Sequence, residues 1–320
     1  MKAVFLDLDT LGPDDIDIQP LRNKLPEFTS FPDTRPGQLD ERIADAEIVL
    51  INKVRLDQTN LRSATRLRLV CLAATGTDNV DLDCARDLGI GVCNIRNYCT
   101  PSVVQHVFAL ILALTQRLRQ YDALMATNAW SQSDQFCLLD FPIRELAGKT
   151  LGVVGLGALG SGVASVAQAF GMNVIAARRA GIQNDQASVQ RIELNELLTQ
   201  SHVISLHCPL TAETSGMIDA DALQSMRNDA LLINTARGGL VNSAALVAAL
   251  RGNQIGGAGI DVLPIEPPLD GDPLLDCDLP NLIVTPHIAW AARESRQRAV
   301  EEMVKNIVSF IDGGRRNRVT

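Results

Sequence analysis

The sequence predicts an α/β protein with two doubly wound parallel sheets, and three observations carry this prediction. Its 320 residues are enough for two domains of about 150 residues each. Short apolar runs alternate with helix-like segments along most of the chain, as parallel strands alternate with crossover helices. A glycine-rich loop, Gly155–Gly160, follows one of these runs and opens a helix.

Composition excludes several classes of protein. An apolar fraction of 46% with 21% charged residues is ordinary for a globular protein, and no run reaches the roughly 18 apolar residues of a membrane span. The formal net charge of -8 offers no surplus of cations for a nucleic acid partner. The amino terminus lacks the apolar core of a signal peptide, so we expect a cytoplasmic protein. Its seven cysteines include no CxxC pair; we expect reduced thiols and no metal site.

The first hundred residues carry four strand-like runs and then a long apolar helix. The predicted strands are Val4–Leu8, Glu47–Ile51, Leu69–Ala73 and Gly91–Asn94. The helix is predicted over Ser102–Arg117, with Thr100 as its cap and Pro101 in its first turn. It is too short to span a bilayer and is typical of a buried helix. An irregular arm, Ala129–Ile143, follows.

A second series of strands and helices fills the rest of the chain. Its predicted strands are Thr150–Val154, Asn173–Ala177, Val203–His207, Ala230–Asn234, Gly256–Asp261 and Leu282–Thr285, with helices at Gly160–Phe170, Ser243–Leu250 and Arg293–Asp312. We expect the last helix to return to the first lobe. The predicted architecture is a Rossmann-type cofactor domain, residues 100–287, inserted in a flavodoxin-like substrate domain, residues 1–99 and 288–320.

The glycine loop indicates a dinucleotide cofactor. Gly155, Gly157 and Gly160 let the backbone turn tightly after a strand and approach a pyrophosphate closely. The unpaired N–H groups of the following helix and its dipole favour an anion there. A tight turn without a ligand is the alternative.

The end of the next predicted strand bears on which nicotinamide cofactor binds. An NAD-binding unit places a carboxylate about twenty residues after the glycines, to accept hydrogen bonds from the ribose. Here the chain has Arg178 and Arg179, whose guanidinium groups would attract a 2′-phosphate. We therefore expect NADP to be preferred, or at least accepted beside NAD. The alternative is that both arginines are only solvated.

Three reactive side chains lie at or just beyond predicted strand ends: Arg237, Glu266 and His287. Carboxyl ends of parallel strands are where doubly wound sheets bind ligands, so the three can converge. Reduction of a 2-oxo acid needs a cation for the substrate carboxylate and carbonyl, which suits Arg237, and a proton for the alkoxide, which suits His287. Glu266, if bonded to the imidazole, would raise the pKa of His287 and keep it protonated.

The chain resembles the D-isomer-specific 2-hydroxyacid dehydrogenases over nearly its whole length. The resemblance rests on VVGLGALG, HCPLTAETSGMI, LLINTARGGLV, GAGIDVLPIEPP and VTPHIAW, in this order and spacing. It implies that Arg237, Glu266 and His287 form the catalytic trio. It is closest to the glycerate dehydrogenase or hydroxypyruvate reductase branch, which implies reversible reduction of hydroxypyruvate, and of glyoxylate, with NAD(P)H.

The same resemblance implies further contacts. Backbone N–H groups of Thr75 and Gly76 would hold the substrate carboxylate, and a homodimer would form through the long helix and the arm. The cofactor would meet Ala158 and Leu159 at its pyrophosphate, Cys208, Pro209 and Thr214 at its flank, Thr235 and Ala236 at the nicotinamide ribose, and Asp261 at the carboxamide.

Two other functions stay open at this point. One keeps the fold and changes the substrate to glyoxylate, phenylpyruvate or another 2-oxo acid. The other is a cofactor-sensing corepressor, a binding protein instead of an enzyme. The remaining histidines, His106, His202 and His207, are expected to be packing or surface residues.

Overall fold

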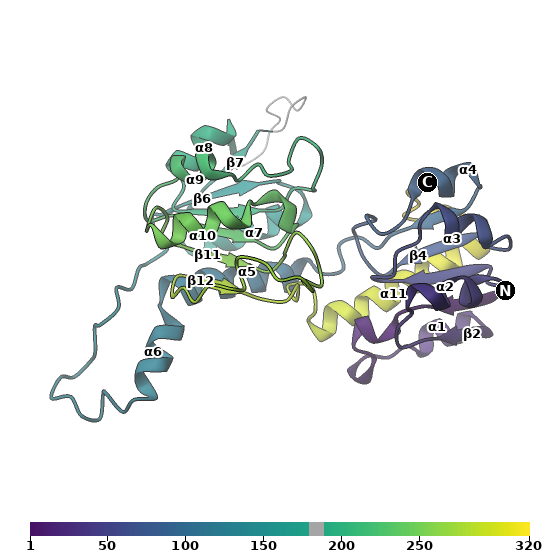
Figure 1. Ribbon diagram of the computed structural model, residues 1–320, viewed down its shortest axis with the longest axis horizontal. Coiled ribbons are helices and arrows are strands. Elements are labelled where there is room, and N and C mark those ends of the chain that lie inside the picture. The colour runs from purple at the N-terminus through teal and green to yellow at the C-terminus, as the bar shows by residue number, and fades with distance from the viewer. Residues whose placement is uncertain (179–188) are drawn as a thin grey trace. The chain divides into compact units, whose positions relative to one another are not determined.

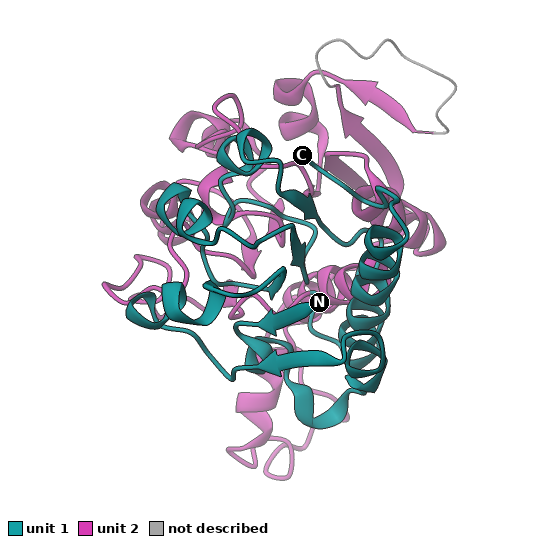
Figure 2. Cartoon of the chain, turned by 90° about the vertical axis from the view of Figure 1, so that its right-hand side faces the viewer, with its two compact units in different colours: residues 1–99, 290–320 teal, residues 100–289 magenta. Residues whose placement is uncertain are grey.

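The computed structural model describes residues 1–178 and 189–320, which form two compact units (Figures 1 and 2). The first unit comprises Met1–Cys99 and Trp290–Thr320, and the second comprises Thr100–Ala289. Each unit has one parallel sheet with helices on both faces, which confirms the predicted fold class. Among the described residues, no helix combines the length and the apolarity needed to span a bilayer.

The sheet of the first unit has five parallel strands in the order β2-β1-β3-β4-β5. The strands are β1 (Lys2–Phe5), β2 (Glu27–Ser30), β3 (Ile48–Ile51), β4 (Leu69–Leu72) and β5 (Gly91–Cys93). The α-helices are α1 (Gln19–Lys24), α2 (Pro36–Ile43), α3 (Gln58–Ser63), α4 (Leu82–Asp87) and α11 (Arg293–Ile311). β3 and β4 are central and fully buried, because both faces of the sheet are covered.

Helix α11 closes the first unit from the far end of the chain. It packs on β4 and on α1, while α2, α3 and α4 contribute to the apolar cluster on the other face of the sheet. Its buried side chains are mostly apolar and recur at helical spacing, and its exposed face is charged. The C-terminal segment beyond α11 returns to the sheet edge, where the Val319 N–H donates to the Val92 carbonyl at 2.8 Å.

The sheet of the second unit has seven parallel strands in the order β12-β11-β10-β9-β6-β7-β8. They are β6 (Thr150–Val154), β7 (Asn173–Ala177), β8 (Gln190–Ile192), β9 (Val203–Leu206), β10 (Leu231–Asn234), β11 (Gly257–Ile260) and β12 (Leu282–Val284). The α-helices are α5 (Thr100–Thr115), α6 (Leu118–Met125), α7 (Ala158–Ala169), α8 (Leu194–Gln200), α9 (Ala220–Ser225) and α10 (Ser243–Arg251).

The helices of the second unit form two layers. Helices α5 and α7 pack against each other on one face of the sheet, and α8, α9 and α10 cover the opposite face. Helix α5 already includes Thr100, which the sequence had suggested as its cap. It ends before Arg117, whose left-handed φ of 55° turns the chain into α6. Helix α6 and the arm after it project from the rest of this unit (Figure 1).

Candidate active site

The glycine loop joins β6 to α7 through a tight turn at Gly155. Gly155 has a φ of 100°, and a Cβ atom on it would lie 2.6 Å from the backbone nitrogen of Cys208, so only glycine fits. Gly157 is the N-cap of α7, and Ala158, Leu159 and Gly160 form its first turn. No described side chain caps this helix, so its first N–H groups are available to an anion.

Two buried polar atoms at the next strand ends lack a hydrogen-bond partner among the described residues. They are Nδ1 of His207, just after β9, and Oγ1 of Thr235, just after β10. Burial lowers the pKa of His207 to about 4, so its imidazole is neutral near pH 7. Unsatisfied buried polar atoms are costly, and a bound ligand is one way to satisfy them. This region therefore fits the polar part of a cofactor.

The other residues expected at the cofactor lie in the same strand-end loops. Cys208 and Pro209 follow His207, and Ala236 follows Thr235. Thr214 folds back so that its hydroxyl donates to the Pro209 carbonyl at 2.8 Å, which fixes the loop after β9. Burial raises the pKa of the Cys208 thiol, so this cysteine is an apolar wall and not a thiolate.

Arg178, at the end of β7, has an acidic neighbour that sequence reasoning missed. A guanidinium nitrogen of Arg178 lies 3.0 Å from a carboxylate oxygen of Glu193, and both side chains are half or more exposed to solvent. An exposed ion pair of this kind contributes at most about 1 kcal/mol, so a phosphate could compete for the guanidinium. Arg179 lies outside the described residues.

The structure brings Glu266 and His287 together. Nδ1 of His287 lies 2.6 Å from Oε2 of Glu266, a short contact of the kind that charge-assisted hydrogen bonds make. The second carboxylate oxygen of Glu266 accepts the Leu263 N–H at 2.8 Å, which fixes the carboxylate against its own loop. Nδ1 is therefore the ring nitrogen that faces the carboxylate, and Nε2 lies on the other side of the ring.

Arg237 follows β10, the strand beside the one that leads to Glu266. The side chain of Asn234 donates to the Arg237 carbonyl at 2.9 Å and holds the turn. A Cβ atom on the next residue, Gly238, would lie 1.9 Å from the carbonyl carbon of Leu263. The loops that carry Arg237 and Glu266 therefore pack backbone against backbone, which only a glycine allows.

Asp261 organises the turn that presents His287. The backbone of His287 is left-handed, with a φ of 55°, which is unusual for a residue with a side chain. The Asp261 carboxylate accepts from Thr285 Oγ1 at 2.5 Å and from the N–H groups of Ile288 and Ala289 at 2.9 Å each. Its carbonyl accepts the His287 N–H at 2.7 Å. These four bonds hold the strained turn in place.

His106 supports the same turn from α5. Its Nε2 lies 3.0 Å from Thr285 Oγ1 and 3.5 Å from the Asp261 carboxylate. Because the Thr285 hydroxyl donates to Asp261, it accepts from His106, so Nε2 of His106 carries the proton. The sequence had suggested only a packing role for His106. A polar residue on an otherwise apolar helix was the signal that could have revealed this contact.

Thr75 and Gly76, the residues expected at the substrate carboxylate, follow β4 in the first unit. The Thr75 hydroxyl donates to the Ile95 carbonyl at 2.9 Å, and the Asn94 amide donates to the Thr75 carbonyl at 2.7 Å. The loop is therefore tethered at both its side chain and its backbone.

A small pocket of about 40 Å³ lies at the opposite edge of the second unit's sheet, away from these residues. It is lined by residues at the amino ends of strands, including Lys149, His202 and Gly256. The described residues contain no group of three or more histidine, cysteine or acidic side chains able to hold a metal ion. The side chains of Arg237, Glu266 and His287 offer guanidinium, carboxylate and imidazole groups at the carboxyl edge of the sheet.

A dinucleotide loop and an imidazole–carboxylate pair at the carboxyl edge of one parallel sheet are typical of nicotinamide-dependent oxidoreductases. A family model described as "D-isomer specific 2-hydroxyacid dehydrogenase, NAD binding domain" matches residues 108–289. The chain is 44% identical to a glycerate dehydrogenase of Methylorubrum extorquens, over 99% of this chain and 98% of that protein. The chain therefore belongs to the D-isomer specific 2-hydroxyacid dehydrogenase family, as the sequence motifs indicated.

Two further proteins are similar over almost their full length. The chain is 36% identical to a hydroxypyruvate reductase of Blautia hydrogenotrophica, over 98% of each. A solved structure titled as an acyclic imino acid reductase, Bsp5, in complex with NADPH and D-Arg has a TM-score of 0.87 and 28% identity, and the match covers 100% of both chains. The chain is thus a D-2-hydroxyacid dehydrogenase with a nicotinamide cofactor.

Proposed function

We propose that this enzyme interconverts hydroxypyruvate and D-glycerate with NAD(P)H, and that it also reduces glyoxylate. The proposal rests on the 2.6 Å contact between Nδ1 of His287 and Oε2 of Glu266. These two residues and Arg237 follow β12, β11 and β10, which are consecutive strands of the second sheet. The likeness to a glycerate dehydrogenase and to a hydroxypyruvate reductase supports the choice of substrate.

The proposed mechanism gives each side chain one task. Nε2 of protonated His287 donates a proton to the carbonyl oxygen, and Glu266 stabilises the imidazolium through Nδ1. The fork of Arg237 binds the substrate carboxylate and polarises the neighbouring carbonyl. The family resemblance also suggests the N–H groups of Thr75 and Gly76 as donors to the substrate carboxylate. When bound, the nicotinamide supplies the hydride. In the oxidative direction neutral His287 accepts the proton back.

The cofactor would be held along the carboxyl edge of the second sheet. The first turn of α7, at Ala158 and Leu159, would bind the pyrophosphate, and Thr235 and Ala236 would bind the nicotinamide ribose, with Asp261 at the carboxamide. We propose that NADPH is accepted beside NADH, because Arg178 stands where a ribose-binding carboxylate is common. The NADPH complex of the similar imino acid reductase supports this proposal.

Steady-state kinetics with hydroxypyruvate and glyoxylate, each against NADH and NADPH, test these assignments. We expect hydroxypyruvate to have a higher kcat/KM than glyoxylate. We also expect the rates with NADPH and NADH to agree within about tenfold, since an exposed ion pair between Arg178 and a 2′-phosphate contributes on the order of 1 kcal/mol. A strong preference for NADH would remove the NADPH proposal. If phenylpyruvate is reduced faster than hydroxypyruvate, the proposed substrate is wrong. If no 2-oxo acid is reduced, the corepressor function is favoured.

Replacement of Glu266 by glutamine should lower kcat for hydroxypyruvate reduction by about tenfold or more. Glutamine keeps an oxygen that can accept from Nδ1 of His287, but it loses the negative charge that stabilises the imidazolium. A hydrogen bond to a charged group contributes roughly 1.5–3 kcal/mol, which sets the size of the loss. Steady-state kinetics with hydroxypyruvate and NADH measure it. A kcat equal to that of the wild type would show that Glu266 does not assist the acid.

We propose a homodimer formed through α6 and the arm. These segments carry several large apolar side chains that are more than half exposed: Leu118, Trp130, Phe136, Leu139 and Ile143. Phe136 is 95% exposed, a liability that a second subunit would remove. Multi-angle light scattering at micromolar concentration should give twice the chain mass, and Phe136→Asp with Leu139→Asp should give the chain mass. A monomeric wild type would contradict the proposal.

We also propose a cytoplasmic location, which the cysteines support. All seven are free, and Cys71, Cys84, Cys93 and Cys99 are buried. Burial raises the pKa of the Cys99 thiol, which keeps it protonated and unreactive. Thiols of this kind are typical of a reducing compartment.

A further inference from the structure

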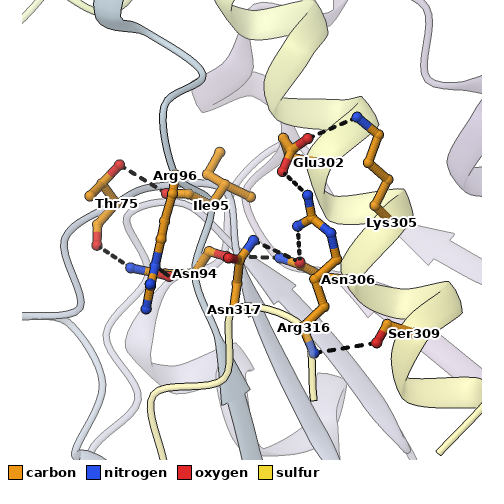
Figure 3. A network of polar contacts seen from close by, with 10 residues as sticks. All are labelled: Thr75, Asn94, Ile95, Arg96, Glu302, Lys305, Asn306, Ser309, Arg316 and Asn317. Atoms are coloured by element: carbon orange, nitrogen blue, oxygen red, sulfur yellow. Dashed lines mark hydrogen bonds and ion pairs between the residues drawn. The ribbon is translucent and has the colours of Figure 1, made fainter. Parts of the chain in front are cut away.

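A line of buried amides in the first unit connects the Thr75–Gly76 loop to helix α11 and to the chain's C-terminal segment (Figure 3). Nδ2 of Asn94, just after β5, donates to the Thr75 carbonyl at 2.7 Å. Nδ2 of Asn306, on α11, donates to the Asn94 carbonyl at 2.8 Å. Asn94 is 6% exposed and Asn306 is 1% exposed; the Asn306–Asn94 bond is buried, and the Asn94–Thr75 bond is partly buried.

The C-terminal segment fixes the orientation of the Asn306 amide. A guanidinium nitrogen of Arg316 and Nδ2 of Asn317 each lie 3.1 Å from Oδ1 of Asn306. Arg316 is itself held by Glu302 on α11, at 2.8 Å. Because two donors occupy the Asn306 oxygen, its NH2 group must face Asn94. Likewise Nε of Arg96 donates to Oδ1 of Asn94 at 3.3 Å, which turns the Asn94 NH2 group toward Thr75.

The bond from Asn94 to the Thr75 carbonyl also fixes the Gly76 N–H, which is the proposed donor to the substrate. The Thr75 carbonyl and the Gly76 N–H belong to the same planar trans peptide, so they point in opposite directions. When Asn94 holds the carbonyl, it also fixes the direction of the Gly76 N–H. The Thr75 hydroxyl, bonded to the Ile95 carbonyl at 2.9 Å, prevents the loop from rotating about this bond.

We propose that Asn94 is a positioning residue that aims the Gly76 N–H at the substrate carboxylate, and that Asn306 with the C-terminal segment supports it. The inference rests on the proposed role of the Thr75–Gly76 loop. Asn94, Gly76 and Asn306 are uncharged. Asn94 therefore acts on the direction of the Gly76 N–H bond and not on the local charge.

Replacement of Asn94 by aspartate tests the proposal, because it keeps the shape and the oxygen that accepts from Arg96 but removes the donor. Above the pKa of the introduced carboxyl, a carboxylate would face the Thr75 carbonyl and displace it. KM for hydroxypyruvate should then rise about tenfold or more, the effect of one hydrogen bond to a charged group, while kcat changes much less. NADH affinity, measured by fluorescence titration, should be unchanged.

The pH dependence tests whether the donor to Thr75 is what matters. When the introduced carboxyl is protonated it can donate to Thr75 again, so the ratio of variant KM to wild-type KM should fall toward one between about pH 8 and pH 5. The midpoint of thermal unfolding at each pH shows separately how far folding is affected. A ratio that stays constant over this range, or a KM equal to that of the wild type at pH 8, would overturn the proposal.

Two further variants complete the test. Asn281→Asp is the matched control: this buried asparagine also donates to a carbonyl, that of Leu250 at 3.4 Å, but in the second unit. Its KM should not change. Gly76→Pro removes the N–H itself. If Gly76→Pro leaves KM unchanged, the proposed role of the loop is wrong; if it raises KM but Asn94→Asp does not, only the present inference fails.

Asn306→Asp provides a second route in case Asn94→Asp does not fold. It removes the donor to the Asn94 carbonyl, but its carboxylate gains an ion pair with Arg316, which favours folding. We expect a smaller rise in KM, about threefold, because one neutral hydrogen bond contributes roughly 0.5–1.5 kcal/mol. An unchanged KM would exclude the C-terminal segment from the proposed support.

Discussion

His287→Gln is expected to lower kcat for hydroxypyruvate reduction by a factor of about a hundred to ten thousand, which is the usual contribution of a positioned general acid. The glutamine amide can still bond to Glu266, so the loop geometry is retained, but it has no proton to transfer near neutral pH. NADH binding should stay within about threefold, because only proton transfer is removed. Single-turnover kinetics and a fluorescence titration of NADH measure the two quantities separately.

His202→Gln is the matched control for this experiment. His202 lies at the amino edge of the same sheet, where its Nδ1 accepts the Thr150 N–H at 3.1 Å. Burial together with nearby Arg227 lowers the pKa of His202, so this replacement removes no charge at neutral pH. Its kcat should match that of the wild type. If His287→Gln also retains wild-type turnover, His287 is not the acid.

The strands of the fold were largely predictable because buried parallel strands are continuous apolar runs. β6 and β7 have the predicted bounds, and the other predicted strands differ by a few residues at their ends. The largest difference is at β1, predicted over Val4–Leu8 and found at Lys2–Phe5. There the buried Asp7 carboxylate accepts three backbone N–H groups from Asn52, Lys53 and Val54, which ends the strand pairing.

Several of the elements that the sequence did not predict have little burial. β2 is an edge strand whose residues are exposed or half-buried, and β8 is an edge strand of three residues. Helix α6 has no buried residue at all. Such elements form because neighbouring elements pair with them or hold them, so their own sequences carry only a weak pattern.

The same distinction holds for the candidate site. The residues with reactive side chains, Arg237, Glu266 and His287, could be proposed from chemistry and from strand ends. The residues that place them could not, since Asp261, Thr285 and His106 act through hydrogen bonds between segments far apart in sequence. Glu193, which pairs with Arg178, is an exposed acid like many others until the fold sets it, just after β8, beside the end of β7.

Arg237→Met should lower kcat/KM for hydroxypyruvate by about a thousandfold, because the variant loses both the charge-assisted bonds to the carboxylate and the polarisation of the carbonyl. Methionine fills the space of the aliphatic part of arginine, and the turn itself is held by Asn234 and by Gly238, so the backbone should not move. Arg237→Lys should recover only part of the loss, since lysine restores the charge but not the planar fork.

The control for Arg237→Met is Arg227→Met, which removes an arginine whose Nε lies 2.9 Å from Asp229 at the amino edge of the sheet. It should leave kcat/KM unchanged. The pattern across substrates locates the effect of Arg237. If its fork binds the carboxylate, then hydroxypyruvate and glyoxylate, which share the 2-oxo acid group, should lose similar factors. A loss confined to hydroxypyruvate would mean that Arg237 recognises the hydroxymethyl end, and equal loss of NADH affinity would place it at the cofactor.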